Sequence, residues 1–204
     1  MRFSRLHWVF VLMLISSLGL SLGQSIPTGV GQSANNGCLC HGSASNVTET
    51  TLIGVPTVFE SNQTYNLTIQ IQSTVEQSNA SQGGFRLLVN AGTIVFENQS
   101  HAQLIDDGWT HTGEGNAHRS WNLTWTSPLD NTTSAEFIVY GNAVNGNQNP
   151  MGDQWDGFGI TVPGSSFDGD LIQPSVEQPY ELMDYSVIIV GLLAILVMFY
   201  FVVK

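Results

Sequence analysis

The stretch that decides the fold is Tyr65-Asn66-Leu67-Thr68-Ile69-Gln70-Ile71, in which apolar and polar residues alternate one by one. Successive side chains of an extended strand point to opposite faces, so this pattern predicts a β-strand with one buried face. Further rows of the same period follow: Phe85 to Val89, Thr93 to Phe96, Trp121 to Trp125, Ala135 to Val139 and Phe158 to Val162. No segment before the C-terminal tail shows a convincing helical period.

Turns rich in Gly and Asn separate these rows. Roughly six to eight short strands over about 120 residues indicate an all-β fold, an immunoglobulin-like antiparallel β-sandwich. We assign the sandwich to residues 47–163. Residues 24–46, rich in Gly, Ser and Asn, predict an N-terminal loop, and residues 164–184, rich in Gly, Ser, Asp, Gln and Pro, predict a stalk.

The two ends of the chain carry patterns of export and membrane attachment. Residues 1–23 combine basic Arg2 and Arg5 with a short apolar stretch and small residues, which is typical of a signal peptide. Residues 185–203 hold no charged residue, and at ~1.5 Å per residue they are long enough for a ~30 Å hydrocarbon core. They predict one C-terminal transmembrane helix. With Lys204 in the cytoplasm, the protein is expected in the cell membrane as a single-pass protein with its ectodomain outside.

The stretch between those ends is strongly acidic. It holds all sixteen Asp and Glu residues, and its only basic residues apart from histidine are Arg86 and Arg119. This charge argues against nucleic acid as a partner, because nucleic-acid surfaces are recognised by clustered Lys and Arg. A glycan or a protein remains as the expected class of ligand.

Seven Asn-x-Ser/Thr acceptor motifs occur in the predicted ectodomain, and none has proline in its middle position. Each is a candidate glycosylation site in an exported protein, provided that the cell has the machinery. Their asparagines are Asn46, Asn62, Asn66, Asn79, Asn98, Asn122 and Asn131.

The chain has two cysteines, both in Cys38-Leu39-Cys40-His41. Outside the cell they are candidates for a Cys38–Cys40 disulfide, although so small a ring is strained. The motif also resembles the C-x-x-C-H signature of c-type haem, with one residue fewer between the cysteines. As a third alternative, two thiolates and an imidazole suit a transition metal, with His111, His101 or His118 as a further ligand. Free thiols are the fourth.

A series of short motifs resembles the Reeler-like domains, and more closely the surface proteins called choice-of-anchor V. The matching pieces are Gly37 to Gly42, Gly83-Gly84-Phe85-Arg86, Gly108-Trp109-Thr110-His111, Trp125 to Pro128, Gly141 to Gly146 and Gly152-Asp153. The resemblance covers roughly residues 37–162. It implies an immunoglobulin-like sandwich, export and a variable C-terminal anchor, and no single activity.

The resemblance also bears on the cysteine motif. Because loops of a sandwich gather at its two ends, we expect Cys38, Cys40 and His41 to lie near His111 at one end. The match at both places strengthens this expectation. The acidic pairs Asp106-Asp107 and Asp153 with Asp156 are expected to be solvated loops rather than calcium ligands.

The sequence contains no Gly-x-Ser-x-Gly, His-Glu-x-x-His or phosphate-loop motif. We therefore expect a membrane-anchored, non-catalytic binding or adhesion module rather than an enzyme. The alternative is an anchored redox or metal protein in which Cys38, Cys40, His41 and His111 hold a transition metal or a c-type haem.

Overall fold

A computed structural model describes residues 26–41, 44–78, 80–176 and 182–203. The predicted signal peptide, the acceptor Asn79 and residues 177–181 of the predicted stalk lie outside this part of the chain. Two compact units are distinguished, and residues 23–177 form the unit that contains every strand described here.

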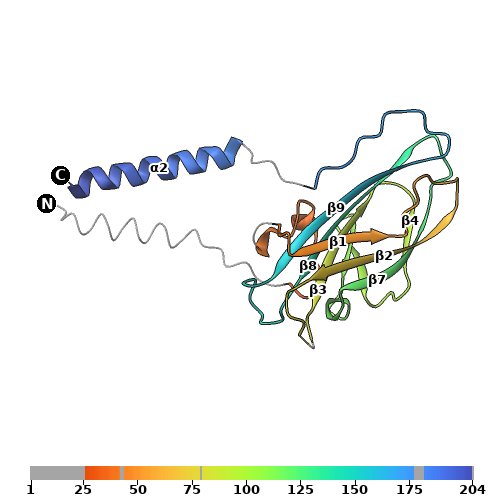
Figure 1. Cartoon of the computed structure of the whole chain (residues 1–204), viewed down its shortest axis with the longest axis horizontal. Helices are drawn as coiled ribbons and strands as arrows, with labels where there is room; N and C mark the ends of the chain where they lie inside the picture. Colours follow the sequence, from red (N-terminus) through yellow and green to blue (C-terminus); the bar gives the residue numbers. More distant parts are fainter. Residues whose placement is uncertain (1–25, 42–43, 79, 177–181, 204) are drawn as a thin grey trace. The chain divides into compact units, whose positions relative to one another are not determined.

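Two sheets make up this unit, and neighbouring strands in each are antiparallel (Figure 1). The four-stranded sheet has the order β1 (Thr48–Ile53), β2 (Thr64–Ser73), β7 (Ser120–Thr126) and β4 (Thr93–Phe96). The five-stranded sheet has the order β5 (Ala102–Ile105), β6 (Gly108–His111), β3 (Gly83–Val89), β8 (Ser134–Ala143) and β9 (Gln154–Pro163). The prediction of an all-β protein built from antiparallel sheets is confirmed.

The strand order gives a topological comparison. β1-β2-β7-β4 follows the order A-B-E-D of an immunoglobulin constant-type sandwich, and β3-β8-β9 follows C-F-G. The β5–β6 hairpin is then an insertion between the fourth and seventh strands that extends the five-stranded sheet beside β3.

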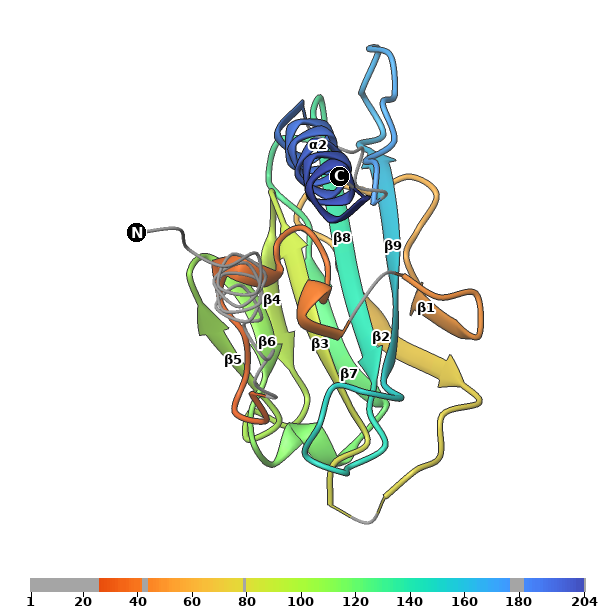
Figure 2. The same cartoon turned by 90° about the vertical axis from the view of Figure 1, so that its left-hand side faces the viewer.

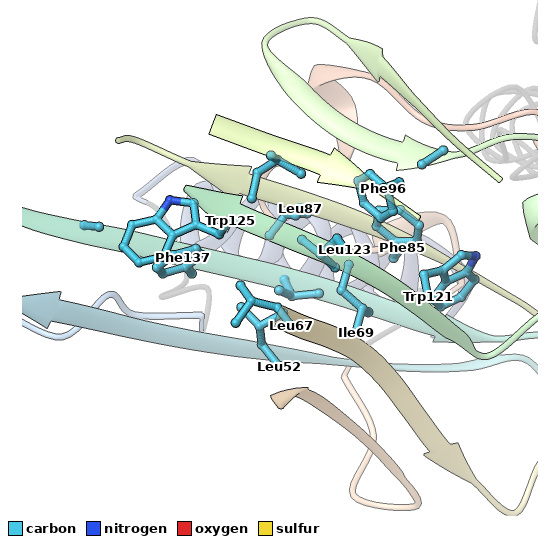
Figure 3. Close-up of a cluster of buried hydrophobic side chains, with 14 of the residues drawn as sticks. Leu52, Leu67, Ile69, Phe85, Leu87, Phe96, Trp121, Leu123, Trp125 and Phe137 are labelled. Carbon is cyan, nitrogen blue, oxygen red and sulfur yellow. The ribbon is translucent and has the colours of Figure 1, made fainter. Parts of the chain in front are cut away.

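The hydrophobic core lies between the two sheets and contains the alternating rows seen in the sequence (Figure 3). Leu67 and Ile69 of β2 stand opposite Leu123 and Trp121 of β7 in the strand register. Their side chains are buried. Burying each large apolar side chain contributes about 1.5–3 kcal/mol, so a few such pairs fix both the facing surfaces and the register.

The region 103–120, which lies between the predicted strands that end at Phe96 and begin at Trp121, contains the β5–β6 hairpin and the short 3₁₀ turn η3 (Gly115–Ala117). Asp106 and Asp107 form the hairpin turn with φ of 48° and 59°. Two consecutive left-handed residues match the right-handed twist of a tight hairpin, and Asp tolerates that conformation better than most residues. The hairpin was missed because its strands of four residues each lack clear alternation.

Residues 26–41, which we call the strap, lie against the outer face of the five-stranded sheet (Figure 2). The strap contains two short 3₁₀ turns, η1 (Gln32–Ala34) and η2 (Leu39–His41). The N-terminal loop predicted from the sequence is thus a packed segment, and η2 carries the cysteine motif.

The first part of the predicted stalk also packs against the sandwich. The Thr161 amide donates to the Gln173 side chain at 2.9 Å, and the Thr161 hydroxyl donates to the Ile172 carbonyl at 2.6 Å. Residues 172–173 therefore run along β9.

The second unit contains helix α2 (Leu182–Val203). In the part of the chain that is described, no helix is long and apolar enough to cross a membrane. The transmembrane helix predicted at residues 185–203 is therefore not confirmed.

Candidate functional site

Arg86 fastens the strap to the sheet. Its side chain is fully buried, and its guanidinium donates to the Asn35 side chain at 2.9 Å and to the Val30 carbonyl at 3.2 Å. It also donates to three carbonyls of the β5–β6 turn, those of Ile105, Asp106 and Gly108, at 2.6–2.9 Å. Burial lowers the pKa of Arg86, whereas the nearby carboxylates of Asp106 and Asp107 favour its charged form.

Two further contacts complete this attachment. The Val30 amide donates to the Thr110 hydroxyl at 3.1 Å, and that hydroxyl donates to the Phe85 carbonyl at 2.8 Å. A side chain at Gly108 would collide with the guanidinium, since an added Cβ would lie 2.5 Å from Cζ of Arg86. The motifs Gly-Gly-Phe-Arg and Gly-Trp-Thr-His therefore belong to one structural network.

A cavity of about 70 Å³ lies beneath the strap, and we call it the strap cavity. It is found near the end of the five-stranded sheet where β3 begins and where β6 and β8 end. All four predicted site residues line this cavity: Cys38, Cys40, His41 and His111. Its lining also includes Gly84, Asn116 and Asn142.

The two cysteines have different environments, and both are free thiols in the structure. Cys40 is exposed, whereas Cys38 is partly buried. Burial, with a smaller contribution from Cys40, raises the pKa of Cys38 to about 12. Cys38 is therefore a protonated, weakly nucleophilic thiol at neutral pH, because the thiolate is the reactive form. The predicted disulfide stays a prediction.

His41 is held by a residue that the sequence did not identify as a partner. Its Nδ1 lies 2.9 Å from Oδ2 of Asp153, and both side chains are largely buried. The other carboxylate oxygen of Asp153 accepts the Asn145 amide at 3.0 Å. Asp153 was expected in a solvated loop, and this expectation is wrong because the 145–153 loop folds back onto the strap. Asp153 contacts Nδ1 of His41, and Nε2 is the other ring nitrogen.

His111 is buried, and its ring forms a hydrogen bond with the backbone. Nδ1 of His111 lies 3.1 Å from the Phe85 backbone amide and 3.4 Å from the Phe85 carbonyl oxygen. Burial lowers the pKa of His111, and hydrogen bonds to the backbone of Phe85 and Ile26 partly oppose this effect. An added Cβ at Gly84 would lie 2.5 Å from the ring, so only glycine allows this close approach.

Asn142 is the remaining polar residue of the cavity wall. It is 6% exposed, and its Oδ1 is the one buried side-chain N or O atom without a hydrogen-bond partner in the described part of the chain. A buried acceptor of this kind costs about 1–3 kcal/mol unless something donates to it. The cavity has room for one or more water molecules, each needing about 10–15 Å³.

The volume of the strap cavity and the arrangement of its side chains can be compared with what a haem or a metal ion requires. Pockets that enclose cofactors and drug-sized ligands measure about 300–1,000 Å³, so this cavity does not enclose a haem. Across residues 26–41, 44–78, 80–176 and 182–203, no group of three or more His, Cys, Asp or Glu is arranged to hold a metal ion. His111 shares the cavity with the cysteine motif, but its Nδ1 is already occupied by a backbone hydrogen bond.

A second, larger pocket of about 330 Å³ lies where β4 ends and β7 begins, and we call it the histidine pocket. Its wall is mostly polar and consists of Phe96, Glu97, Asn98, His101, His118, Ser120, Trp121 and Asn122. The rings of His101 and His118 contact each other at a tilt of 30°, with centroids 4.3 Å apart. The sequence singled out these two histidines only as alternative ligands for the cysteine motif, and the structure places them in this separate pocket.

The acceptor asparagines can also be placed. Asn46, Asn62, Asn66, Asn98 and Asn122 are exposed, and Asn131 is half-buried. Asn66 and Asn122 lie on neighbouring strands of the four-stranded sheet, whose outer face therefore carries two acceptor sites. Whether any of them is modified stays a prediction.

Comparisons with known proteins add little to the fold. No protein-family model and no curated protein sequence matches the chain. Among solved structures, the reeler domain of human F-spondin is 13% identical, with 60% of this chain and 91% of that chain covered at a TM-score of 0.41. A conjugative transposon lipoprotein from Bacteroides eggerthii is 16% identical, with 57% and 98% covered and a TM-score of 0.36.

A third similar structure is AggA, the major subunit of aggregative adherence fimbriae type I from Escherichia coli. It is 8% identical, with 58% of this chain and 95% of that chain covered and a TM-score of 0.36. One of these structures is a Reeler domain, the kind of domain that the sequence motifs resemble. Choice-of-anchor V is not confirmed, and scores this low carry no argument about function.

Proposed function

We propose that this chain is an exported, non-catalytic binding module. The observation that carries the proposal is the state of its buried titratable groups. Catalytic sites tune such groups toward neutral pH and leave them free to react. Here burial raises the pKa of Cys38 to about 12, and His111 is held by the backbone. Arg86 and Arg119 donate to backbone carbonyls. These four side chains therefore stabilise the folded structure.

A binding assay with a parallel search for turnover tests this proposal. The full-length chain in detergent is immobilised and exposed to saccharides, to peptides and to a second copy of itself. We expect saturable, reversible binding of one class, with the probe recovered chemically unchanged by mass spectrometry. Conversion of a probe that is abolished in Cys38→Ser or His41→Gln would contradict the proposal.

One specific observation favours the second candidate function, a redox or metal protein. A metal-binding histidine usually donates its other ring N–H to a carboxylate, which fixes its orientation, and the His41–Asp153 pair has this form. Cys38 and Cys40 would supply thiolates to a soft ion such as copper or zinc beside it. Metal analysis and visible absorption of the purified chain test this candidate. A metal-free, colourless protein after loading with Cu(I) or Zn²⁺ would argue against it.

Export and membrane attachment belong to the main proposal and are supported by the sequence alone. Residues 1–23 have the pattern of a signal peptide, and residues 185–203 hold no charged residue. A broad-specificity protease added to intact cells should digest residues 24–184. Full protection in intact cells, followed by digestion after lysis, would contradict this orientation.

A further inference from the structure

The histidine pocket has no role in the network around the strap, yet it is the larger of the two cavities. We propose that it binds a neutral saccharide, a refinement that rests on the proposed binding function. Its volume of about 330 Å³ falls at the lower end of the range for small-molecule sites, which suits about one or two sugar rings.

The polar groups of the pocket match the hydroxyl groups of a sugar, each of which donates and accepts. Nδ2 of Asn122 donates to Oε2 of Glu97 at 2.8 Å, so the amide and the carboxylate are held side by side. Nδ2 of Asn98 lies 2.9 Å from Nε2 of His101. The ligand therefore meets a carboxylate acceptor and amide donors whose orientation is already set, which reduces the entropy lost on binding.

The paired histidines supply an aromatic surface. Their ring planes are inclined by 30° and their centroids are 4.3 Å apart, with His118 the more exposed of the two. Such rings offer an aromatic face against which the C–H face of a sugar can pack. Among the described residues no group of three or more His, Cys, Asp or Glu is arranged to hold a metal ion, and this applies to the histidine pocket as well.

The charge of the pocket selects against anionic ligands. Glu97 lines it, and Oε1 of Glu114 lies 4.0 Å from Nε2 of His101. Arg86 and Arg119, the only Lys or Arg residues between 24 and 184, are buried and donate to backbone carbonyls. Sulfated, phosphorylated or acidic sugars therefore find carboxylates and no accessible Lys or Arg.

A neutral saccharide can reach this pocket from two sources. It can belong to another molecule, or it can be attached to this chain, because Asn98 and Asn122 of the pocket wall are both acceptor asparagines. The two sources share one chemistry and are separated by producing the full-length chain in hosts with and without N-glycosylation.

The test uses the full-length chain in detergent, made without N-glycosylation, and an array of neutral and acidic saccharides. We expect binding of a neutral saccharide, at least about tenfold weaker binding of its uronic-acid counterpart, and a further loss of about tenfold or more in His118→Ala and Ser120→Tyr. Thr93→Tyr is the matched control, because Thr93 is also an exposed first residue of a strand in the same sheet but lies outside the pocket. It should bind normally, and circular dichroism should show that all variants are folded.

The outcomes separate this inference from the proposed function. Saccharide binding that is unchanged in both pocket variants, or that favours acidic sugars, overturns the inference. Binding of a peptide or a second copy without any saccharide binding overturns it too and leaves the binding function standing, whereas enzymatic conversion of the saccharide contradicts both. If the chain binds neutral saccharide only when made without N-glycosylation, the pocket is assigned to the chain's own glycan.

Discussion

At the scale of single residues, most of the short motifs that occur in order along the sequence converge on the strap and its cavity. Arg86 and Thr110 hold the strap, Gly84 makes room for the ring of His111, and Asp153 orients His41. The sequence predicted that the cysteine motif and His111 lie near each other, and they line one cavity. The motif series included Asp153 and Asn142, but the sequence did not predict that Asp153 pairs with His41, because a contact across 112 residues leaves no local pattern.

Replacing Arg86 by Lys should strongly destabilise the protein. Lys has three donors on one atom and lacks the planar fork, so some of the five acceptors around Arg86 lose their partner. We expect the free energy of unfolding, measured in urea, to fall by about 2–5 kcal/mol. Arg119→Lys, where fewer carbonyls are involved, should cost less. A value for Arg86→Lys within about 0.5 kcal/mol of the parent would contradict the role given to the guanidinium.

The two cysteines should differ sharply toward iodoacetamide. With a pKa of about 12, only about one Cys38 thiol in ten thousand is ionised at about pH 8, whereas Cys40 is exposed. Peptide mass spectrometry should therefore find Cys40 modified first and Cys38 modified only after denaturation. If neither thiol reacts until a reductant is added, the pair is a disulfide.

The buried His111 should make the protein less stable in mild acid. Its folded-state pKa lies below the ordinary value of 6.5, so the unfolded chain binds more protons in the range between the two values. The stability that the protein gains by burying a neutral His111 is fully present above about pH 6.5 and is lost as the pH falls below that value. His111→Gln, which keeps an acceptor for the Phe85 amide, should reduce the fall in urea midpoint between about pH 7.5 and pH 5. Equal falls in parent and variant would exclude this contribution.

At the scale of elements, prediction succeeded where a strand has one fully buried face. The alternating rows of β2, β3, β7 and β8 match strands of the structure, because burial on one face imposes a period of two. It failed for β5 and β6, which are short; β6 pairs with β3, and the turn between β5 and β6 is held by Arg86 of β3, about twenty residues earlier in the sequence. It also failed for the strap, because Gly and Asn composition indicates a loop without saying what the loop packs against.

The β5–β6 turn offers a test at this scale. Asp107 adopts a φ of 59°, a conformation in which glycine carries no steric cost. Asp107→Gly should be about 0.5–1 kcal/mol more stable than Asp107→Asn, the matched variant that also lacks the charge. Urea unfolding of the two variants measures the difference. Equal stabilities would show that the turn is not strained at this position.

At the scale of the whole molecule, residues 23–177 form a compact unit with its own core. We expect this segment to fold without the rest of the chain, with a β-type circular dichroism spectrum. Its free energy of unfolding should agree with that of the full-length chain within the about 10–15% uncertainty of urea extrapolation. Loss of the cooperative transition in the shortened chain would show that the core needs residues outside this unit.

The burial of Arg86 and Arg119 has a consequence for proteolysis. Trypsin cleaves only after Lys and Arg, and between residues 24 and 184 these two arginines are its only sites. Arg86 lies within β3 and Arg119 immediately before β7, and both are buried. The folded sandwich therefore offers trypsin no accessible bond in this region, so the rate of tryptic cleavage reports how often the domain opens. A domain built in this way survives among trypsin-like proteases for as long as it stays folded.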